Sequence, residues 1–296
     1  MGRPPVRVGV VDIGTNSMRL LVTDGTEEVG RWVEVTGLGR GVDRTGTLSP
    51  DRIEESVAAL ARFGAVMDRA EVGKRAAIAT SASRDAANRE EFFDLAESAI
   101  GVRPRLITGA EEARLAFAGA TAQVEVPSPI VVSDIGGGST EFVTAGGEVS
   151  FEIGSVRLTE RSIPTRPAPS TEMESARALV AGLFSEVDLQ AWTLIGVAGT
   201  WTSLAAVALD LPEYSVDRVH GHRMSRDALA DTIDSLASKT LEETAAIAAL
   251  DPKRAPVILG GALVAEGVMD ILDIDEVVVS EHDTLDGVAM ELLAIA

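Results

Sequence analysis

Residues 11–17 read Val-Asp-Ile-Gly-Thr-Asn-Ser, and residues 133–139 read Ser-Asp-Ile-Gly-Gly-Gly-Ser. Asp, Ile, Gly and Ser coincide in the two stretches at a constant offset of 122 residues. Each stretch lies between two short apolar runs rich in β-branched residues, a pattern that predicts a β-hairpin with a polar turn. Two matching hairpins therefore predict a chain built from two similar halves.

The elements predicted around the hairpins repeat in the same order. The first half has predicted strands at 6–11, 18–23, 28–36, 76–80 and 105–108, and predicted helices from 50, at 87–100 and at 110–123. The second has predicted strands at 130–133, 140–144, 149–153, 193–197 and 277–280, and predicted helices after 200 and at 255–272. An offset of 122 residues is too long for a solenoid, whose repeats span about 20–50 residues. Alternating strands and helices instead predict two α/β domains with mixed or parallel sheets, 1–124 and 125–296.

Composition narrows the classes of function. The 296 residues suffice for two domains of ordinary size. With 46 Asp and Glu against 26 Lys and Arg, the net charge of −20 argues against nonspecific binding to nucleic acid or to an anionic membrane. The absence of cysteine excludes disulfides, a thiolate nucleophile and cysteine-ligated metal. No apolar run is long enough for a membrane span and the first residues lack a signal peptide, so the cytoplasm is the expected location.

The two polar turns are candidate phosphate-binding loops. Glycines let the backbone approach a ligand closely, and successive N–H groups can surround phosphate oxygens. An aspartate at the end of the preceding strand, Asp12 or Asp134, can hold a hydrated Mg²⁺ that neutralises the phosphates. A single turn of this kind is more often an ordinary hairpin, but two in matching positions favour loops that clasp opposite ends of a phosphate chain across one cleft. A third glycine-rich turn, at 196–200, opens a predicted helix and suits an anion.

These signals resemble the superfamily of acetate and sugar kinases, heat-shock chaperones and actin. Stretches at 37–43, 80–88, 108–115 and 154–158, together with 134–141, closely resemble the exopolyphosphatase/guanosine pentaphosphate phosphatase (Ppx/GppA) family over nearly the whole chain. The resemblance implies an α/β fold of two actin-like, ribonuclease H-like domains with an interdomain cleft. It also implies Mg²⁺-dependent removal of a terminal phosphate from inorganic polyphosphate or pppGpp, and a homodimer.

The resemblance assigns roles to individual residues. Glu112 matches the carboxylate taken as general base for the attacking water, whereas Glu111 would point about 100° away on a helix. Glu141 is a catalytic candidate from the sequence alone, because it lies in a β-rich run directly after a phosphate turn, where an anion should be repelled. A metal bridge or a water-orienting role explains it. The expected metal-side residues are Asp12, Asp134 and Glu141. The expected phosphate-binding residues are Gly14, Thr15, Asn16, Ser17, Arg84, Gly136, Gly137, Gly138, Ser139, Thr140, Gly199 and Thr200.

Some alternatives stay open. A pppGpp 5′-phosphohydrolase, a (p)ppGpp-binding sensor with little turnover and an ATP-dependent kinase are the rival functions. The sequence offers no aromatic-rich purine pocket and lacks the C-terminal helical domains of longer relatives, so short polyphosphate is the expected substrate. Many family members carry Arg-Glu-Gly near the chain end where this chain has Leu285-Asp286-Gly287, so the role of that arginine is lost or reassigned here.

Overall fold

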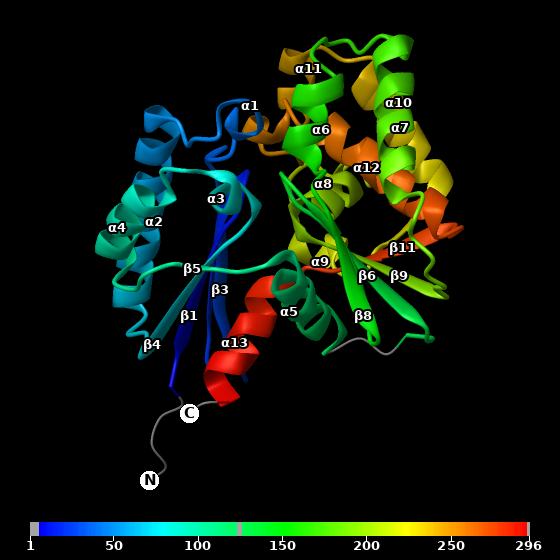
Figure 1. Ribbon diagram of the computed structural model, residues 1–296. Helices are drawn as coiled ribbons and strands as arrows, with labels where there is room; N and C mark the ends of the chain where they lie inside the picture. The colour runs from blue at the N-terminus through cyan, green and yellow to red at the C-terminus, as the bar shows by residue number, and fades with distance from the viewer. Residues whose placement is uncertain (1–5, 123–125, 295–296) are drawn as a thin grey trace. The chain divides into compact units, whose positions relative to one another are not determined.

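The computed structural model describes residues 6–122 and 126–294. The chain divides into two compact units, of which the first joins Met1–Gly119 to Thr284–Ala296 and the second spans Ala120–Asp283. Each unit is built on its own β-sheet with packed helices, as the alternation of predicted elements indicates (Figure 1). No helix in the described part of the chain combines the length and the apolar character that a membrane span requires.

The first unit carries a five-stranded sheet of order β3-β2-β1-β4-β5. Its strands are β1 (Val8–Ile13), β2 (Ser17–Thr23), β3 (Glu28–Val35), β4 (Lys74–Ala79) and β5 (Arg105–Leu106). Its helices are α1 (Val42–Thr45), α2 (Pro50–Arg69), α3 (Ser81–Asp85), α4 (Arg89–Ile100), α5 (Gly109–Thr121) and α13 (Thr284–Ala294). β2 is antiparallel to both β1 and β3, whereas β4 runs parallel to β1 and to β5.

Alternating side chains of β1 supply two cores, one on each face of this sheet. Val11 and Ile13 pack with residues of α2 and α4, including Phe63. Val8 and Val10 pack on the other face with apolar residues of α5 and α13. Since Asp12 alternates with Val11 and Ile13, its side chain belongs to the face that α5 and α13 cover.

The second unit carries a six-stranded sheet of order β10-β11-β9-β6-β7-β8. Its strands are β6 (Ile130–Ile135), β7 (Thr140–Thr144), β8 (Gly147–Phe151), β9 (Thr193–Val197), β10 (Arg223–Ser225) and β11 (Glu276–Val279). Its helices are α6 (Ser155–Ser162), α7 (Ser170–Phe184), α8 (Ala198–Ala208), α9 (Val216–Val219), α10 (Arg226–Ala237), α11 (Leu241–Ala245), the 3₁₀ turn η1 (Pro252–Arg254) and α12 (Ile258–Ile271). Helix α12 is apolar along most of its length because it packs against α6, α7, α8 and α10.

The internal repeat predicted from the sequence is present in both sheets. Strands β3-β2-β1-β4 of the first unit have the same order as β8-β7-β6-β9 of the second. The two turns close alike, because the N–H groups of Gly14 and Gly136 donate to the carbonyls of Ser17 and Ser139, each at 3.0 Å. The predicted class of fold, two similar α/β units, is confirmed.

The division of the chain differs from the expected one at its C-terminal end. The predicted boundary between 124 and 125 touches residues outside the described ones. The expected second domain included α13, but α13 packs on the sheet of the first unit (Figure 1). Leu285 is buried in that core, and Asp286 accepts two hydrogen bonds from Arg31 on β3. A Cβ on Gly287 would lie 2.2 Å from the carbonyl oxygen of Leu115, so glycine is what lets α13 cross α5.

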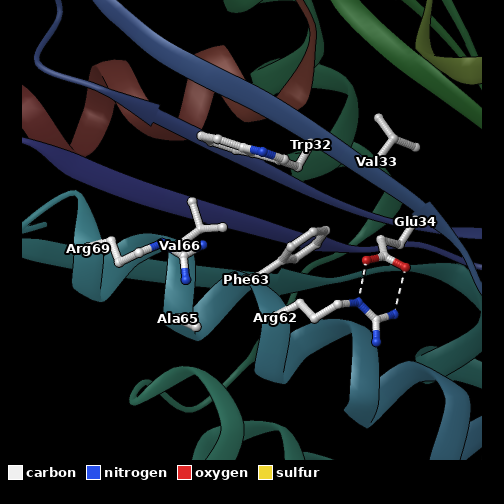
Figure 2. A pocket seen from close by; sticks show the side chains of 8 residues that line it. All are labelled: Trp32, Val33, Glu34, Arg62, Phe63, Ala65, Val66 and Arg69. Atoms are coloured by element: carbon white, nitrogen blue, oxygen red, sulfur yellow. Dashed lines mark hydrogen bonds and ion pairs between the residues drawn. The ribbon is translucent and has the colours of Figure 1, made fainter.

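A shallow pocket of about 320 Å³ lies between β3 and α2. Figure 2 shows the rings of Trp32 and Phe63 in it, with Glu34 and Arg62 alongside, joined by hydrogen bonds of 2.6 and 2.7 Å. None of the residues that line this pocket is one of the predicted site residues. This pocket is therefore separate from the predicted site residues.

Candidate active site

The turn between β1 and β2 is held from two sides. A Cβ on Gly14 would lie 2.9 Å from the carbonyl oxygen of Ser17, so this tight turn requires glycine. The carbonyl of Thr15 accepts from the N–H of Gly39 at 2.7 Å, and its hydroxyl accepts from the N–H of Ala82 at 3.2 Å. The first predicted phosphate loop is thereby fixed against the chain that follows β3 and against α3.

Asn16 presents a polar group beside this turn. Its backbone carbonyl accepts from the N–H groups of Thr36 and Gly37, at 3.0 and 2.9 Å. Its side-chain oxygen is buried and has no hydrogen-bond partner among the described residues. Because a buried polar atom without a partner is costly, this atom marks a place where a ligand or water completes the site.

Arg84 connects α3 to the first turn of α5. Its Nη1 donates to Oε2 of Glu112 and to the carbonyl of Ile107, both at 3.0 Å. Glu112 is 9% exposed, whereas its neighbour Glu111 turns away and pairs with the exposed Arg105. The structure thus separates the two carboxylates as the helical spacing predicts and places the candidate base against the candidate phosphate-binding arginine.

Asp12 has a cationic partner on the neighbouring strand. It lies directly opposite Arg19 in the register of β1 and β2, and Arg19 donates to Oδ2 of Asp12 from Nε at 3.0 Å and Nη2 at 2.5 Å. A carboxylate bonded in this way to a guanidinium is already neutralised and has less use for a metal ion. This pairing does not add support for Asp12 beside a metal ion, and that role stays a prediction.

The turn between β6 and β7 is shaped by the start of α6. The N–H groups of Ser155 and Val156 donate to the carbonyls of Gly136 and Gly137, at 3.0 and 2.8 Å. Gly154 permits this approach, since a Cβ there would lie 2.6 Å from the carbonyl oxygen of Gly136. A trans peptide directs its C=O and the following N–H to opposite sides. The N–H groups of Gly137 and Gly138 therefore point away from α6 and are the candidate phosphate donors of the second unit.

Three predicted phosphate-binding residues of the second unit lie against other parts of that unit. The hydroxyl of Thr140 donates to the carbonyl of Ile153 at 2.6 Å, which uses its only proton. Thr200 is buried, and its side chain faces Gly261. Gly199 lies under the guanidinium of Arg254, whose Nη1 would be 2.3 Å from a Cβ at that position. The hydroxyl proton of Thr140 is thus not available to a phosphate, whereas the roles of Gly199 and Thr200 stay predictions.

Two buried acids face each other in the second unit. Asp134 lies directly opposite Glu141 in the register of β6 and β7, and they are 4% and 0% exposed. Directly opposed side chains in a β-sheet have Cβ atoms about 5 Å apart, where like charges repel. Ser150, opposite Glu141 on β8, donates to Oε1 at 2.9 Å. The pair is a place where a divalent cation would relieve the repulsion.

The acidic pair has the chemistry that Mg²⁺ prefers but is not a complete metal cage. Among residues 6–122 and 126–294, no three or more histidines and acids form a group that could hold a metal ion. Mg²⁺ is commonly held by one or two carboxylates, with water and substrate phosphates as the other ligands. Asp134 and Glu141 fit that mode of binding.

Sequence reasoning missed three serines around these groups. Ser81 and Ser83 precede Arg84 on α3, and both hydroxyls are buried without a hydrogen-bond partner in the described part of the chain. Ser150 contacts Glu141. The sequence did carry a signal for Ser81 and Ser83, because both lie close to Arg84 along the chain. It carried none for Ser150, whose place opposite Glu141 depends on the register of β7 and β8.

Comparison with known proteins places this geometry in a family. The family model described as the Ppx/GppA phosphatase family matches residues 11–295. Exopolyphosphatase 2 of Mycobacterium tuberculosis is 38% identical over 313 residues, which cover 97% of this chain and 98% of that protein.

Solved structures agree with that match. The crystal structure of an exopolyphosphatase-like protein is 37% identical, has a TM-score of 0.93 and aligns over 98% of this chain and 99% of its own. The Aquifex aeolicus member of the Ppx/GppA family is 30% identical, with a TM-score of 0.81 and coverage of 98% of both chains. The predicted class of enzyme, a phosphoanhydride hydrolase, is confirmed. The chain belongs to the Ppx/GppA phosphatase family.

Proposed function

We propose that this chain is an exopolyphosphatase that releases terminal phosphates from inorganic polyphosphate, with short chains as the better substrate. The observation that carries the proposal is the contact between Arg84 and Glu112, which joins a phosphate-binding group to a carboxylate base. Membership of the family and the likeness to exopolyphosphatase 2 support polyphosphate as the substrate class.

Glu112 is the proposed base for the attacking water. The water gives a proton to the carboxylate of Glu112 while its oxygen forms a bond to the terminal phosphorus. The bond from that phosphorus to the bridging oxygen breaks, and its electron pair stays on the shortened chain. Orthophosphate is the other product, and no covalent enzyme intermediate is needed.

Each unit offers donors that can balance charge on phosphate oxygens. In the first unit, Arg84 supplies a guanidinium. In the second, the N–H groups of Gly137 and Gly138 point away from α6 and can donate to a phosphate. Positioning and electrostatic stabilisation of this kind account for most of the catalysis of phosphoryl transfer.

Asp134 and Glu141 would hold Mg²⁺, which would neutralise phosphate oxygens when bound. Ser150 keeps one oxygen of Glu141 in place, at 2.9 Å. The opposed carboxylates gain from such an ion, whereas the pair of Asp12 and Arg19 does not. The cytoplasmic location and the homodimer stay predictions from the sequence.

A phosphate-release assay tests the proposal. The purified chain is incubated with Mg²⁺ and with short polyphosphate, long polyphosphate, pppGpp or ATP. We expect orthophosphate from polyphosphate, with kcat/KM highest for short chains. Turnover of pppGpp alone would assign the nucleotide phosphohydrolase instead, and binding of (p)ppGpp without turnover of any substrate would assign the sensor. Transfer of phosphate from ATP to an acceptor would assign the kinase.

A further inference from the structure

Helix α3 carries hydrogen-bond donors that the protein does not use. Ser81 and Ser83 are 2% and 1% exposed, and neither hydroxyl has a hydrogen-bond partner among the described residues. Nη2 of Arg84 is likewise buried without a partner in that part of the chain. Buried polar atoms in folded proteins are nearly always paired, so unpaired donors such as these mark places where a ligand or a water molecule completes the hydrogen bonding.

Two of these donors share one side of the helix. Residues three apart on a helix are neighbours, which brings Ser81 beside Arg84. Ser83 is two positions from Ser81 and lies about 200° round the helix from it. The geometry therefore pairs the hydroxyl of Ser81, rather than that of Ser83, with the guanidinium of Arg84.

The orientation of Arg84 is fixed by its other nitrogen. Nη1 is held by the carboxylate of Glu112 and the carbonyl of Ile107, both at 3.0 Å. Since the guanidinium is planar and rigid, these two contacts also determine where Nη2 points. Arg84 can thus bind an anion through Nη2 without releasing Glu112.

The ligand that fits these groups is a phosphoryl group. A hydroxyl and a guanidinium N–H are donors, and a phosphoryl group offers several acceptor oxygens with negative charge. The other half of the same guanidinium contacts the proposed base, so an anion on Nη2 lies beside Glu112. Such a position suits the phosphorus that water attacks and not one further along the chain.

We infer that Ser81 joins Arg84, the phosphate-binding arginine expected from the resemblance, in holding the terminal phosphoryl group of the substrate. The inference rests on the proposed function for the identity of the substrate, but the binding of phosphate at α3 stands apart from turnover. Ser81 donates to one non-bridging oxygen and Nη2 of Arg84 to another. The orthophosphate product is held by the same groups before it leaves.

Titration of orthophosphate into the whole chain by calorimetry, in excess EDTA, tests the subsite without turnover. We expect Ser81→Ala to weaken phosphate binding about 10- to 100-fold, the usual worth of a hydrogen bond to a charged group. Ser83→Ala is the matched control, because it removes an equally buried hydroxyl from the same helix, and we expect affinity within twofold of the original chain. Equal effects of the two variants, or none from Ser81→Ala, would overturn the inference.

Thermal unfolding supplies a second readout. Removing an unsatisfied hydroxyl is nearly neutral or stabilising, so both variants should melt no lower than the original chain without phosphate. Added orthophosphate should then raise the melting temperature of the original chain and of Ser83→Ala, but not of Ser81→Ala. A phosphate-dependent rise in Ser81→Ala equal to that of the original chain would contradict the subsite. These outcomes are independent of whether polyphosphate is hydrolysed, so failure of the inference and failure of the proposed function are distinguishable.

Discussion

Glu141 on β7 lies directly opposite Asp134 on β6, and both carboxylates are buried. At the equivalent place in the first unit, Arg19 lies opposite Asp12 and bonds to it. Equivalent positions of the two hairpins therefore hold an ion pair in the first unit and two acids in the second. This difference sets the two hairpins apart in charge, and the proposed Mg²⁺ belongs with the acidic pair.

The first prediction concerns the acidic pair. Asp134→Asn should lower activity and raise the Mg²⁺ concentration needed for half-maximal activity, because one of the two charged ligands is lost. In excess EDTA the same variant should melt at a higher temperature than the original chain, because the repulsion from Glu141 is relieved. Activity is measured against Mg²⁺ concentration, and unfolding by calorimetry.

Asp12→Asn is the control for that experiment. It weakens the pairing of the partly buried Arg19, so the free energy of unfolding should fall by about 1–3 kcal/mol. Its Mg²⁺ requirement should stay that of the original chain. Full activity of the original chain in excess EDTA would remove the metal from the proposal.

The second prediction concerns the base. Glu112→Gln keeps the shape of the side chain and an oxygen that accepts from Arg84, but it cannot take a proton from water. Turnover of polyphosphate should fall by roughly 10²–10⁴-fold, with little change in substrate binding. Glu111→Gln is the matched control, because Glu111 pairs with Arg105 outside the site. A Glu112→Gln variant that turns over within threefold of the original chain would take this residue out of the mechanism.

The third prediction concerns the crossing of α13 and α5. Gly287→Ala forces a Cβ against the backbone carbonyl of Leu115, at 2.2 Å before relaxation. The free energy of unfolding should fall by about 1–3 kcal/mol, as overpacking does. Because α5 carries Glu112, kcat should fall as well, while a structural loss alone would lower only the fraction folded.

The control for that variant is Gly182→Ala on α7, where nothing lies within 4 Å of the added carbon. It should raise the free energy of unfolding by about 0.4–1 kcal/mol, because alanine restricts the unfolded chain. Denaturant unfolding and single-turnover kinetics on both variants separate stability from chemistry. Equal stability of Gly287→Ala and the original chain would contradict the account of the crossing.

The two hairpins could be predicted from the sequence because short stretches of chain determine them. The two Asp-Ile-Gly turns were enough to place both hairpins, and the counterpart of Glu141 in the first repeat, Arg19, holds the equivalent register position. The pattern of a single sequence does not show which residues far apart in the chain contact each other. Arg84 donates a hydrogen bond to Glu112, which is 28 positions away in the sequence. The hydroxyl of Thr140 donates to the carbonyl of Ile153.

The return of α13 to the first unit was missed for the same reason. Chain order placed it with the second half, but its packing partners are at the other end of the chain. Asp286 bonds to Arg31, and Gly287 contacts Leu115. Leu285, Asp286 and Gly287 thus hold this helix against the sheet and against α5 of the first unit.

The last prediction concerns chain length. Polyphosphate carries about one negative charge per phosphate, and the groups proposed to bind it number only a few, at α3, the β6–β7 turn and the acidic pair with Mg²⁺. Outside those groups a long polymer meets a chain with a net charge of −20, and such repulsion is screened over about 10 Å at 0.1 M salt.

We therefore expect kcat/KM to be higher for short than for long polyphosphate. Added salt should raise kcat/KM for long chains and so bring the two values closer together. Measurements at one free Mg²⁺ concentration and two ionic strengths decide this. The opposite result is a kcat/KM that keeps rising with chain length and falls with added salt, as a basic binding groove would give. It would show that a positive surface guides the polymer and that the short-chain preference is wrong.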